Sequence, residues 1–262
     1  MSESLPKQSQ QYSNQIIGSR IVHHKVISST MTEAEQLANQ DCDEGTVVLA
    51  DNQISGRGRF NRDWISAPGK DLLVSIVLRP KLSQLRYVNM AATIAVADMA
   101  KNITEQSVSI KWPNDVRING KKVAGILVES ALDNSTLKHA IVGIGINVNS
   151  DPESDPNTGG NSTSLFMETG EEIPIKSVLD SIFSSMNELY IKVLQGCSLT
   201  QMWAGNIDTI GEIINVKYGD SFVEGIARGV DPEGNLIVTK PDGSDITLVG
   251  GEVTLKDAFT GT

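Results

Sequence analysis

The chain of 262 residues carries 39% hydrophobic and 21% charged residues, a composition that fits a folded globular protein and excludes an intrinsically disordered one. Its formal net charge of -10 excludes an overall attraction to nucleic acid or to anionic lipid. No apolar run approaches the roughly 20 residues that cross a bilayer, and the polar start of the chain is unlike a secretion signal. We therefore expect a cytoplasmic protein with neither a membrane nor a nucleic acid partner.

Apolar periodicity and turn signals divide the chain into predicted elements. Residues 1–14 are mostly polar and predict a flexible tail. The predicted strands are 16–27, 46–50, 72–80, 108–111, 116–118, 123–132 and 137–148, and the predicted helices are 32–39, 87–103 and 174–195. Thr32 and Glu35 are expected to form a capping box at the start of the first helix. Short connections, such as the turn at Asn119-Gly120, favour an antiparallel or mixed sheet, so we expect an α+β fold.

The texture of the sequence changes after Gly211. Short apolar runs occur at 213–216, 223–230, 236–239, 246–249 and 253–255, and the turns between them are rich in glycine, proline and aspartate. Five short strands within about fifty residues predict a small β-barrel. We therefore expect a first domain at 15–208 and a barrel domain at 209–262.

The two cysteines and three histidines do not indicate a metal or disulfide site. Cys42 and Cys197 are far apart, and neither belongs to a CxxC pair. His23 and His24 are adjacent, so on an extended segment their side chains point to opposite faces. Residues that bind a metal are left unassigned.

A long polar loop at 51–71 joins two predicted buried strands and contains the run GRGRFNRDW at 56–64. Loops of this length within a compact domain are often binding loops. Arg57, Arg59 and Arg62 carry planar cations that suit phosphate or carboxylate, and glycine lets the backbone approach a ligand closely. A solvated basic loop is the plain alternative, but the position between buried strands favours anion binding.

The run KWPNDV at 111–116 follows the predicted strand 108–111. Pro113 removes a backbone donor and ends that strand, so Asn114 and Asp115 are expected at the rim of the sheet, where their side chains can contact a ligand. An ordinary turn stabilised by the same two side chains is the alternative.

Two further runs contain strand glycines, KKVAGILVES at 121–130 and VGIGINVN at 142–149, and in the first of them a lysine precedes the strand. Lys122 is either a solvated hairpin charge or a cation that reaches a phosphate, while Gly125 leaves room for a ligand. Gly143 and Gly145 similarly leave space beside a flat ligand. VGIGINVN lacks the third glycine and the following helix of a dinucleotide-binding turn, and no P-loop motif occurs. Any nucleotide is therefore held in another way.

Taken together and in this order, these motifs resemble the biotin protein ligase family. The resemblance covers residues 20–256 and rests on Ser29-Thr30, GRGRFNRDW, KWPNDV and KKVAGILVES, with GIGIN and GEVTLK in support. It implies a catalytic domain similar to class II aminoacyl-tRNA synthetases, a mixed sheet flanked by helices, followed by an SH3-like barrel. Repressor-type members add an amino-terminal helix-turn-helix domain. Because only a short polar stretch precedes the first predicted strand, we expect a monofunctional ligase that does not bind DNA.

The resemblance also implies an activity. A biotin protein ligase activates biotin with ATP to biotinyl-5'-AMP and transfers biotin to a lysine of the biotin carboxyl carrier domain of a carboxylase. ATP with Mg2+ and biotin are then the substrates, and a homodimer is left open. Two alternatives remain: a lipoate or octanoate protein ligase, which resembles the same fold, and a non-catalytic module that binds a small molecule or a protein.

The resemblance assigns roles residue by residue. Biotin contacts are implied for Ser29, Thr30, Gln53, Gly56, Arg57, Arg59, Lys122, Gly125 and Gly143. Contacts to ATP or to the adenylate are implied for Arg57, Arg59, Arg62, Trp64, Asn114, Lys122 and Asn147. Catalytic roles are implied for Lys122, which would hold the biotin carboxylate and the α-phosphate, for Arg59, and for Asp115, which would orient or deprotonate the acceptor lysine.

Three positions depart from the pattern of the family. Met31 replaces an asparagine, Asn61 replaces a glycine, and Lys256 replaces an arginine. Asparagine tolerates a positive φ better than most residues, so Asn61 is expected to preserve the turn of the arginine loop. Met31 removes one polar contact from the implied biotin pocket.

Overall fold

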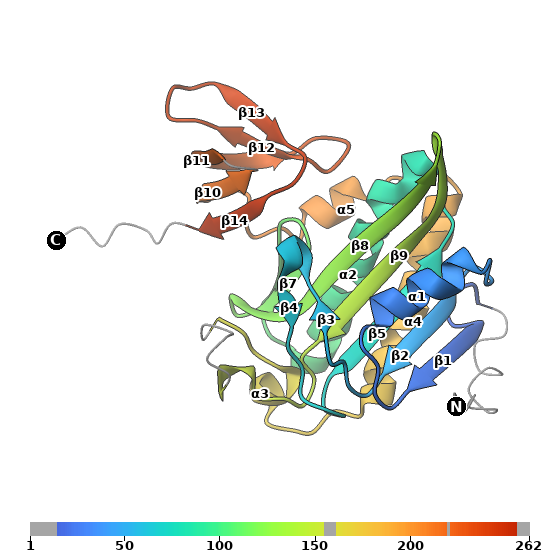
Figure 1. Cartoon of the computed structure of the whole chain (residues 1–262). Helices are drawn as coiled ribbons and strands as arrows, with labels where there is room; N and C mark the ends of the chain where they lie inside the picture. The colour runs from blue at the N-terminus through green and yellow to red at the C-terminus, as the bar shows by residue number, and fades with distance from the viewer. Residues whose placement is uncertain (1–14, 155–160, 219–220, 256–262) are drawn as a thin grey trace.

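The fold is described by a computed structural model that covers residues 15–154, 161–218 and 221–255 (Figure 1). The predicted tail at 1–14 and the departure at Lys256 lie outside the described residues. A large sheet with helices on both faces forms most of the chain, and a smaller sheet formed by the C-terminal strands packs beside it (Figure 1).

The large sheet has seven strands in the order β1-β2-β5-β9-β8-β7-β6. Its strands are β1 (Arg20–His24), β2 (Thr46–Ala50), β5 (Leu72–Leu78), β6 (Val108–Lys111), β7 (Asp115–Ile118), β8 (Lys121–Asp133) and β9 (Thr136–Ile146). The pair β1 and β2 is parallel, and every other neighbouring pair is antiparallel. The predicted mixed sheet is confirmed, and β2 has the predicted bounds.

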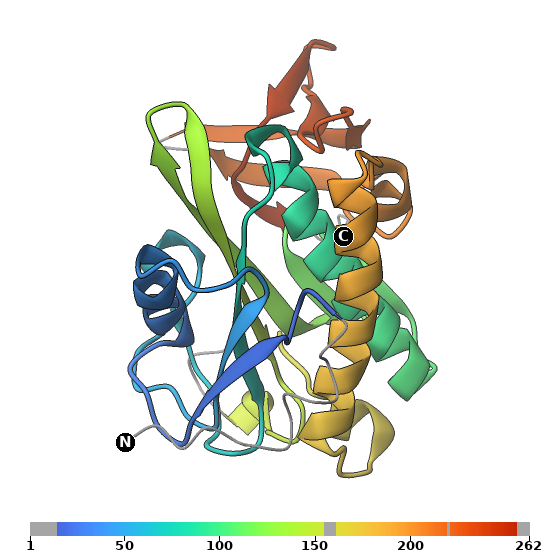
Figure 2. The same cartoon turned by 90° about the vertical axis from the view of Figure 1, so that its right-hand side faces the viewer.

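Helices cover the two faces of this sheet unequally (Figure 2). Two helices of 20 residues each, α2 (Leu85–Thr104) and α4 (Ile175–Leu194), pack together on one face. The shorter α1 (Thr30–Asn39) packs on the opposite face, against β2, β5 and β9. The remaining helical elements are α3 (Leu165–Thr169), α5 (Thr200–Ala204) and the 3-10 turns η1 (Arg59–Asn61), η2 (Leu82–Gln84) and η3 (Pro152–Ser154).

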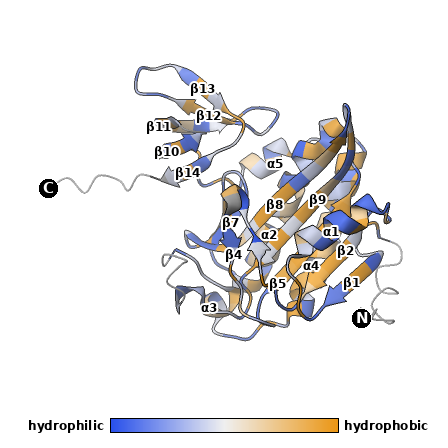
Figure 3. Cartoon of the chain, in the orientation of Figure 1, coloured by the Kyte–Doolittle hydropathy of each residue, from blue (hydrophilic) through white to orange (hydrophobic). Residues whose placement is uncertain are grey.

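The hydrophobic core lies between the sheet and the pair α2 and α4. All seven residues of β5 are buried, and the central strands are strongly apolar (Figure 3). Helix α2 presents a run of buried alanines from Ala91 to Ala100, and their small side chains let its backbone approach its neighbours closely. The other face of the sheet has only a small apolar cluster beneath α1. That face is therefore free to hold a polar pocket.

The start of α1 corrects one sequence prediction. The helix begins at Thr30, not at Thr32, and Ser29 is its N-cap with an extended backbone and no side-chain capping bond. The Thr30 N–H instead donates to Oε1 of Gln53, at 2.7 Å. A distant side chain therefore satisfies a backbone donor at the start of this helix, which begins two residues before the predicted capping box.

The C-terminal strands form a five-stranded antiparallel sheet in the order β13-β12-β11-β10-β14. They are β10 (Ile213–Tyr218), β11 (Ser221–Val230), β12 (Leu236–Thr239), β13 (Asp245–Leu248) and β14 (Glu252–Leu255). The apolar core is continuous from the large sheet into this one, and the Trp112 indole N–H donates to the Gly234 carbonyl at 3.0 Å. The five predicted strands are confirmed, and the division of the chain at residue 208 stays a prediction.

Candidate functional site

A pocket of about 220 Å³ lies on the face of the large sheet that carries α1. Its floor is formed by β8 and β9, its roof by the loop at 56–64, and one wall by β14 of the C-terminal sheet. Of the predicted site residues, the lining contains Thr30, Gln53, Arg57, Arg59, Arg62, Trp64, Asn114, Asp115, Lys122, Gly125 and Gly143. Side chains from distant parts of the sequence therefore meet in one cavity.

Three glycines make the floor of the pocket shallow. A Cβ atom built on Gly125 or Gly145 would lie 2.8 Å or 2.4 Å from the Trp64 ring, and one built on Gly143 would lie 2.6 Å from the Met31 sulfur. Trp64 and Met31 therefore rest directly on the glycine backbone. The sequence predicted that these glycines leave room for a ligand; here the Trp64 and Met31 side chains occupy that space, and the ligand contact stays a prediction.

A buried hydrogen-bond network closes the end of the pocket nearest α1. The Ser75 hydroxyl donates to Thr30 Oγ1 at 2.8 Å, and the Thr30 hydroxyl donates to Gln53 Oε1 at 2.9 Å. Thr30 and Ser75 are buried, so the network is fixed by the surrounding packing. Ser29 lies just behind it, buried but outside the lining, and its hydroxyl has no partner among the described residues.

The roof is a short β-hairpin. Strand β3 (Gly56–Arg57) pairs with β4 (Asp63–Trp64), and the 3-10 turn η1 joins them. Gly56 lies outside the lining, where a Cβ would approach the Trp64 carbonyl to 2.6 Å. The left-handed backbone of the turn falls on Phe60, with φ 57° and ψ 36°, whereas the sequence had pointed to Asn61. Phe60 is therefore the strained residue of this hairpin.

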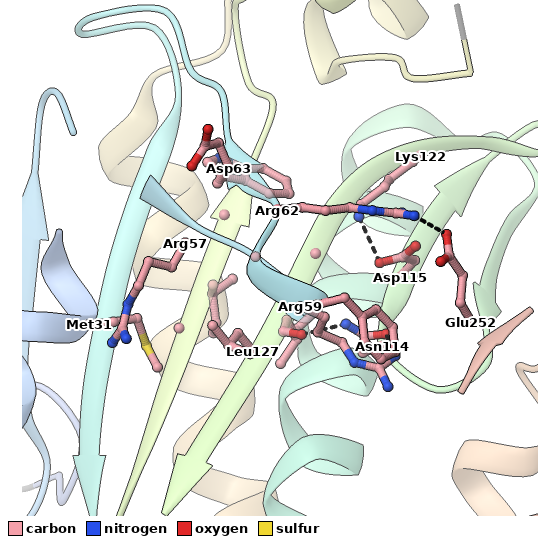
Figure 4. A pocket seen from close by; sticks show the side chains of 18 of the residues that line it. Met31, Arg57, Arg59, Arg62, Asp63, Asn114, Asp115, Lys122, Leu127 and Glu252 are labelled. Atoms are coloured by element: carbon pink, nitrogen blue, oxygen red, sulfur yellow. Dashed lines mark hydrogen bonds and ion pairs between the residues drawn. The ribbon is translucent and has the colours of Figure 1, made fainter. Parts of the chain in front are cut away.

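Each arginine of the roof is held by a different segment of the chain, and Figure 4 shows the partners of Arg59 and Arg62. Arg57 forms an ion pair with Glu129 of β8 at 2.9 Å, and Arg62 forms one with Glu252 of β14 at 2.6 Å. Between them, Arg59 donates to the Asn114 side-chain oxygen at 2.8 Å. Burial lowers the pKa of Arg59 from its ordinary value. The roof is thus pinned at three points along the pocket.

Lys122 stands where floor and roof meet. Its ammonium lies 2.8 Å from a carboxylate oxygen of Asp115 and 5.4 Å from the centre of the Trp64 ring. Asn114, next to Asp115, donates its side-chain N–H to the Ile126 carbonyl at 2.6 Å and so is fixed to β8. The KWPND run and the lysine of β8 therefore form one polar cluster, as the sequence indicated.

Asn147 lies apart from this pocket. It is buried, its side chain donates to the Thr163 carbonyl at 2.9 Å, and it lines a second cavity with Asp71 and Ser150. The structure therefore does not bring Asn147 together with the other predicted nucleotide contacts.

The pocket also contains residues to which sequence reasoning gave no role. Among them are Lys111, Trp112, Leu127 and Glu252. Lys111 and Trp112 belong to a motif that was recognised, so position within the motif could have drawn attention to them. Glu252 belongs to the terminal run GEVTLK, but no local signal indicates that its strand reaches the arginine loop.

The arrangement of charges suits a ligand with several negative charges. Four cations, Arg59, Arg62, Lys111 and Lys122, line the pocket near its junction with β14, against the carboxylates of Asp115 and Glu252. Within the described ranges there is no group of three or more His, Cys, Asp and Glu side chains that could hold a metal ion. The helices in the described part of the chain are too short or too polar to span a membrane.

Comparison with known proteins gives two matches to family models. Residues 23–147 match the model described as "Biotin/lipoate A/B protein ligase family", and residues 209–256 match that described as "Biotin protein ligase C terminal domain". The first range contains the glycine floor, the arginine loop and Lys122, and the second contains β14. Both parts of the pocket thus fall within matched regions.

Individual proteins are similar over most of the chain. The bifunctional ligase/repressor BirA of Bacillus subtilis is 33% identical over 234 residues, which cover 87% of this chain and 72% of that protein. The biotin–[acetyl-CoA-carboxylase] ligase of Paracoccus denitrificans is 31% identical, with coverage of 83% and 93%. The solved structure of a biotin protein ligase from Aquifex aeolicus in complex with biotin and ATP is 29% identical, has a TM-score of 0.75, and covers 91% of this chain and 99% of that one.

Proposed function

The chain belongs to the biotin protein ligase family, and from this premise we propose how its pocket divides between the two substrates. The protein is an enzyme that activates biotin with ATP and transfers it to a protein lysine. The position of Lys122 supports the division, because its ammonium lies above Gly125 of the floor, near the Trp64 ring and beside Asp115, so that it can reach both substrates. Biotin then lies on the α1 side of Lys122, and ATP lies on the β14 side.

The α1 side suits the biotin ring system. Thr30, Ser75 and Gln53 supply a fixed buried set of donors and acceptors that can hydrogen-bond a ureido group. Gly125 and Gly143 leave room for the fused rings once Met31 and Trp64 shift. Ser29, Gly56 and Arg57 support this part of the pocket from its edge, and the proposal keeps them as biotin contacts.

The first chemical step takes place beside Lys122. A biotin carboxylate oxygen attacks the α-phosphorus of ATP, and the bond from the α-phosphorus to the bridging oxygen breaks, so that its electron pair leaves with pyrophosphate. Carboxylate and polyphosphate repel each other, and the Lys122 and Arg59 cations offset that repulsion. Holding both substrates in line against one cation accounts for much of the expected acceleration.

The β14 side suits ATP and the adenylate. Arg59 and Arg62 face the phosphates, Trp64 covers the adenylate, and Asn114 positions the nucleotide; Asn147 keeps a supporting role from the second cavity. Mg2+ is proposed to enter with ATP as the substrate complex. A closed roof then protects the mixed anhydride from water.

In the second step the amine of the acceptor lysine attacks the biotinyl carbonyl. The bond from this carbonyl carbon to the phosphate oxygen breaks, AMP leaves with the electron pair, and the ammonium proton is lost. Asp115 is the proposed group that orients the lysine or accepts its proton, since its carboxylate lines the pocket beside Lys122. The acceptor is proposed to be the biotin carboxyl carrier domain of a carboxylase.

An exchange assay tests this function. The protein is incubated with ATP and labelled pyrophosphate, and incorporation of label into ATP is measured with biotin, with lipoate or with neither acid. Exchange that depends on biotin is expected. Exchange with lipoate alone would support the lipoate or octanoate ligase, and exchange with neither acid would support a non-catalytic binding module. Labelling of a carrier domain then tests the transfer step.

Two expectations from the sequence remain predictions, namely the absence of nucleic acid binding and a cytoplasmic location. Whether the protein forms a homodimer stays open. Gel-shift, fractionation and sedimentation experiments address them in turn.

A further inference from the structure

Lys111 differs from the other cations of the pocket because its side chain has no ionic or hydrogen-bond partner within the described residues. Arg57, Arg62 and Lys122 each form an ion pair, and Arg59 donates to Asn114. Lys111 lines the same pocket and is half-buried. A half-buried cation without a partner is unfavourable unless a ligand supplies the missing negative charge.

Other cations lie near Lys111 and add to the positive charge around its ammonium. In the register of β6 and β7, Lys111 lies opposite Asp115, and Arg117 is two residues further along on the same face. Burial lowers the pKa of Lys111, and the nearby Arg117 cation lowers it further, while Asp115 opposes the shift. Lys122 adds a second repulsive charge.

The carboxylates that could neutralise Lys111 are already paired with other cations. Asp115 lies 2.8 Å from Lys122, and Asp208 lies 3.6 Å from Arg117. Glu252 lies 2.6 Å from Arg62. This corner of the pocket therefore keeps an uncompensated positive charge in a protein whose formal net charge is -10.

We propose that Lys111 binds the β- and γ-phosphates of ATP and the pyrophosphate that leaves when biotin is adenylated. This inference rests on the proposed function. The α-phosphate is assigned to Lys122, and Lys111 lies beyond Asp115 from it, toward the wall formed by β14. The exposed Arg62 lies at that wall, so the polyphosphate has cations on both sides along its way to solvent.

The chemical character of lysine fits this role. Its ammonium is a compact point charge on a long stem, which suits a phosphate group whose position changes between ATP and free pyrophosphate. Biotin carries one negative charge, whereas the leaving group carries several. Removing the charge of Lys111 therefore weakens pyrophosphate binding much more than biotin binding.

The test uses Lys111→Gln in the full chain. At saturating biotin and ATP, the pyrophosphate concentration for half-maximal exchange is expected to rise about tenfold or more, because a hydrogen bond to a charged group is typically worth that factor. The biotin affinity without nucleotide stays unchanged, and so does the rate of carrier labelling from preformed biotinyl-5'-AMP. Lys111→Arg restores part of the pyrophosphate affinity. Lys101→Gln is the matched control, because Lys101 is also half-buried but bonds to Asn206 outside the pocket.

The outcomes separate this inference from the proposed function. If the unmodified protein shows no biotin-dependent exchange, the proposed function fails. If it does show exchange but Lys111→Gln has the same pyrophosphate dependence, only this inference fails. A loss confined to transfer from preformed adenylate would instead assign Lys111 to the carrier domain and overturn the proposal. Lys111→Met keeps the apolar stem and replaces Lys111→Gln if that variant does not fold.

Discussion

The floor and the roof of the pocket are held by contacts of opposite character. The floor rests on buried or half-buried groups: strand glycines that leave no space for a Cβ, and the Ser75, Thr30 and Gln53 hydrogen bonds. The roof rests on exposed or half-exposed ion pairs, of which that between Arg57 and Glu129 leaves each side chain 40% exposed. A buried hydrogen bond is costly to break, whereas an exposed ion pair contributes little.

This difference suggests separate roles for the floor and the roof of the pocket. A floor that cannot rearrange cheaply is suited to recognising one rigid ring system by shape. A roof in which Arg57 and Arg62 are held by weak ion pairs can exchange those pairs for phosphate contacts when ATP binds. Specificity for the acid is therefore expected to depend on the floor, and retention of the adenylate on the roof.

Lys122 joins the two regions, so its removal is expected to have the greatest effect. Lys122→Gln removes the cation that faces both anions, and we expect the rate of adenylation to fall about 100- to 1000-fold, the range found when one group that stabilises a transition-state charge is lost. Single-turnover formation of biotinyl-5'-AMP measures this rate.

The adjacent lysine provides the control for that experiment. Lys121 forms an ion pair with Glu153 and does not line the pocket. Lys121→Gln should therefore keep the adenylation rate of the unmodified protein. Equal losses in the two variants would show that the effect is not specific to Lys122 and would contradict its role in adenylation.

The floor is tested by Thr30→Val, which keeps the side-chain shape and removes the hydroxyl. The Ser75 hydroxyl then loses its acceptor in a buried site, at a cost of about 1–3 kcal/mol. Biotin affinity is expected to fall roughly 10-fold, measured by calorimetry without nucleotide. Thr93→Val is matched, since Thr93 is a buried threonine that accepts from the Trp203 indole outside the pocket. It should lower Tm and leave biotin affinity unchanged; a similar loss of biotin affinity in both variants would contradict a local role.

The contrast between floor and roof also explains what the sequence could predict. Strand β2 at Thr46–Ala50 and strand β12 at Leu236–Thr239 have their predicted bounds, because local apolar runs and turns define them. Lys122 and Asp115 were expected in one site from their motifs, and their ammonium and carboxylate lie 2.8 Å apart.

What the sequence could not predict depends on contacts between distant segments. The ion pair between Arg62 and Glu252 requires β14 to pack beside the arginine loop, and no pattern near either residue encodes that contact. The early start of α1 has the same origin, because Gln53 from another segment receives the Thr30 N–H. The left-handed residue of the roof was expected at Asn61 from its side-chain preference, but in the hairpin Phe60 has the left-handed backbone.

One buried contact of the roof is expected to respond to pH. Asp71 is 2% exposed and accepts from the Ala67 N–H, which follows the roof, and from the Val148 N–H and the Ser150 hydroxyl. Burial raises the pKa of Asp71 above its ordinary value, and the Ser150 hydrogen bond opposes this shift. The folded state therefore holds the proton more tightly than the unfolded state does.

The sign of the effect follows from that difference. The stabilisation from protonated Asp71 is fully present below the ordinary carboxyl pKa and is lost as the pH rises through the higher pKa of the folded state, by about 1.4 kcal/mol for each unit between them. Asp71→Asn cannot titrate, so its deficit in unfolding free energy should shrink as the pH rises through this window. Urea unfolding at several pH values measures the deficit. A deficit that grows with pH would mean that the folded state stabilises the carboxylate.

The weakest expected effect is at the exposed end of the roof. Glu129→Gln removes the partner of Arg57, and because an exposed ion pair contributes about 0.2–1 kcal/mol, trypsin cleavage at the arginines of the loop should rise by no more than about fivefold. The rise should vanish in roughly 1 M salt, where exposed charges are screened, while Tm stays constant. Glu233→Gln, which breaks the exposed pair with Arg86 away from the pocket, should leave loop cleavage unchanged. A fall in Tm for Glu129→Gln alone would mean that this ion pair is as firmly built as the floor, and the roof would then be a fixed part of the pocket.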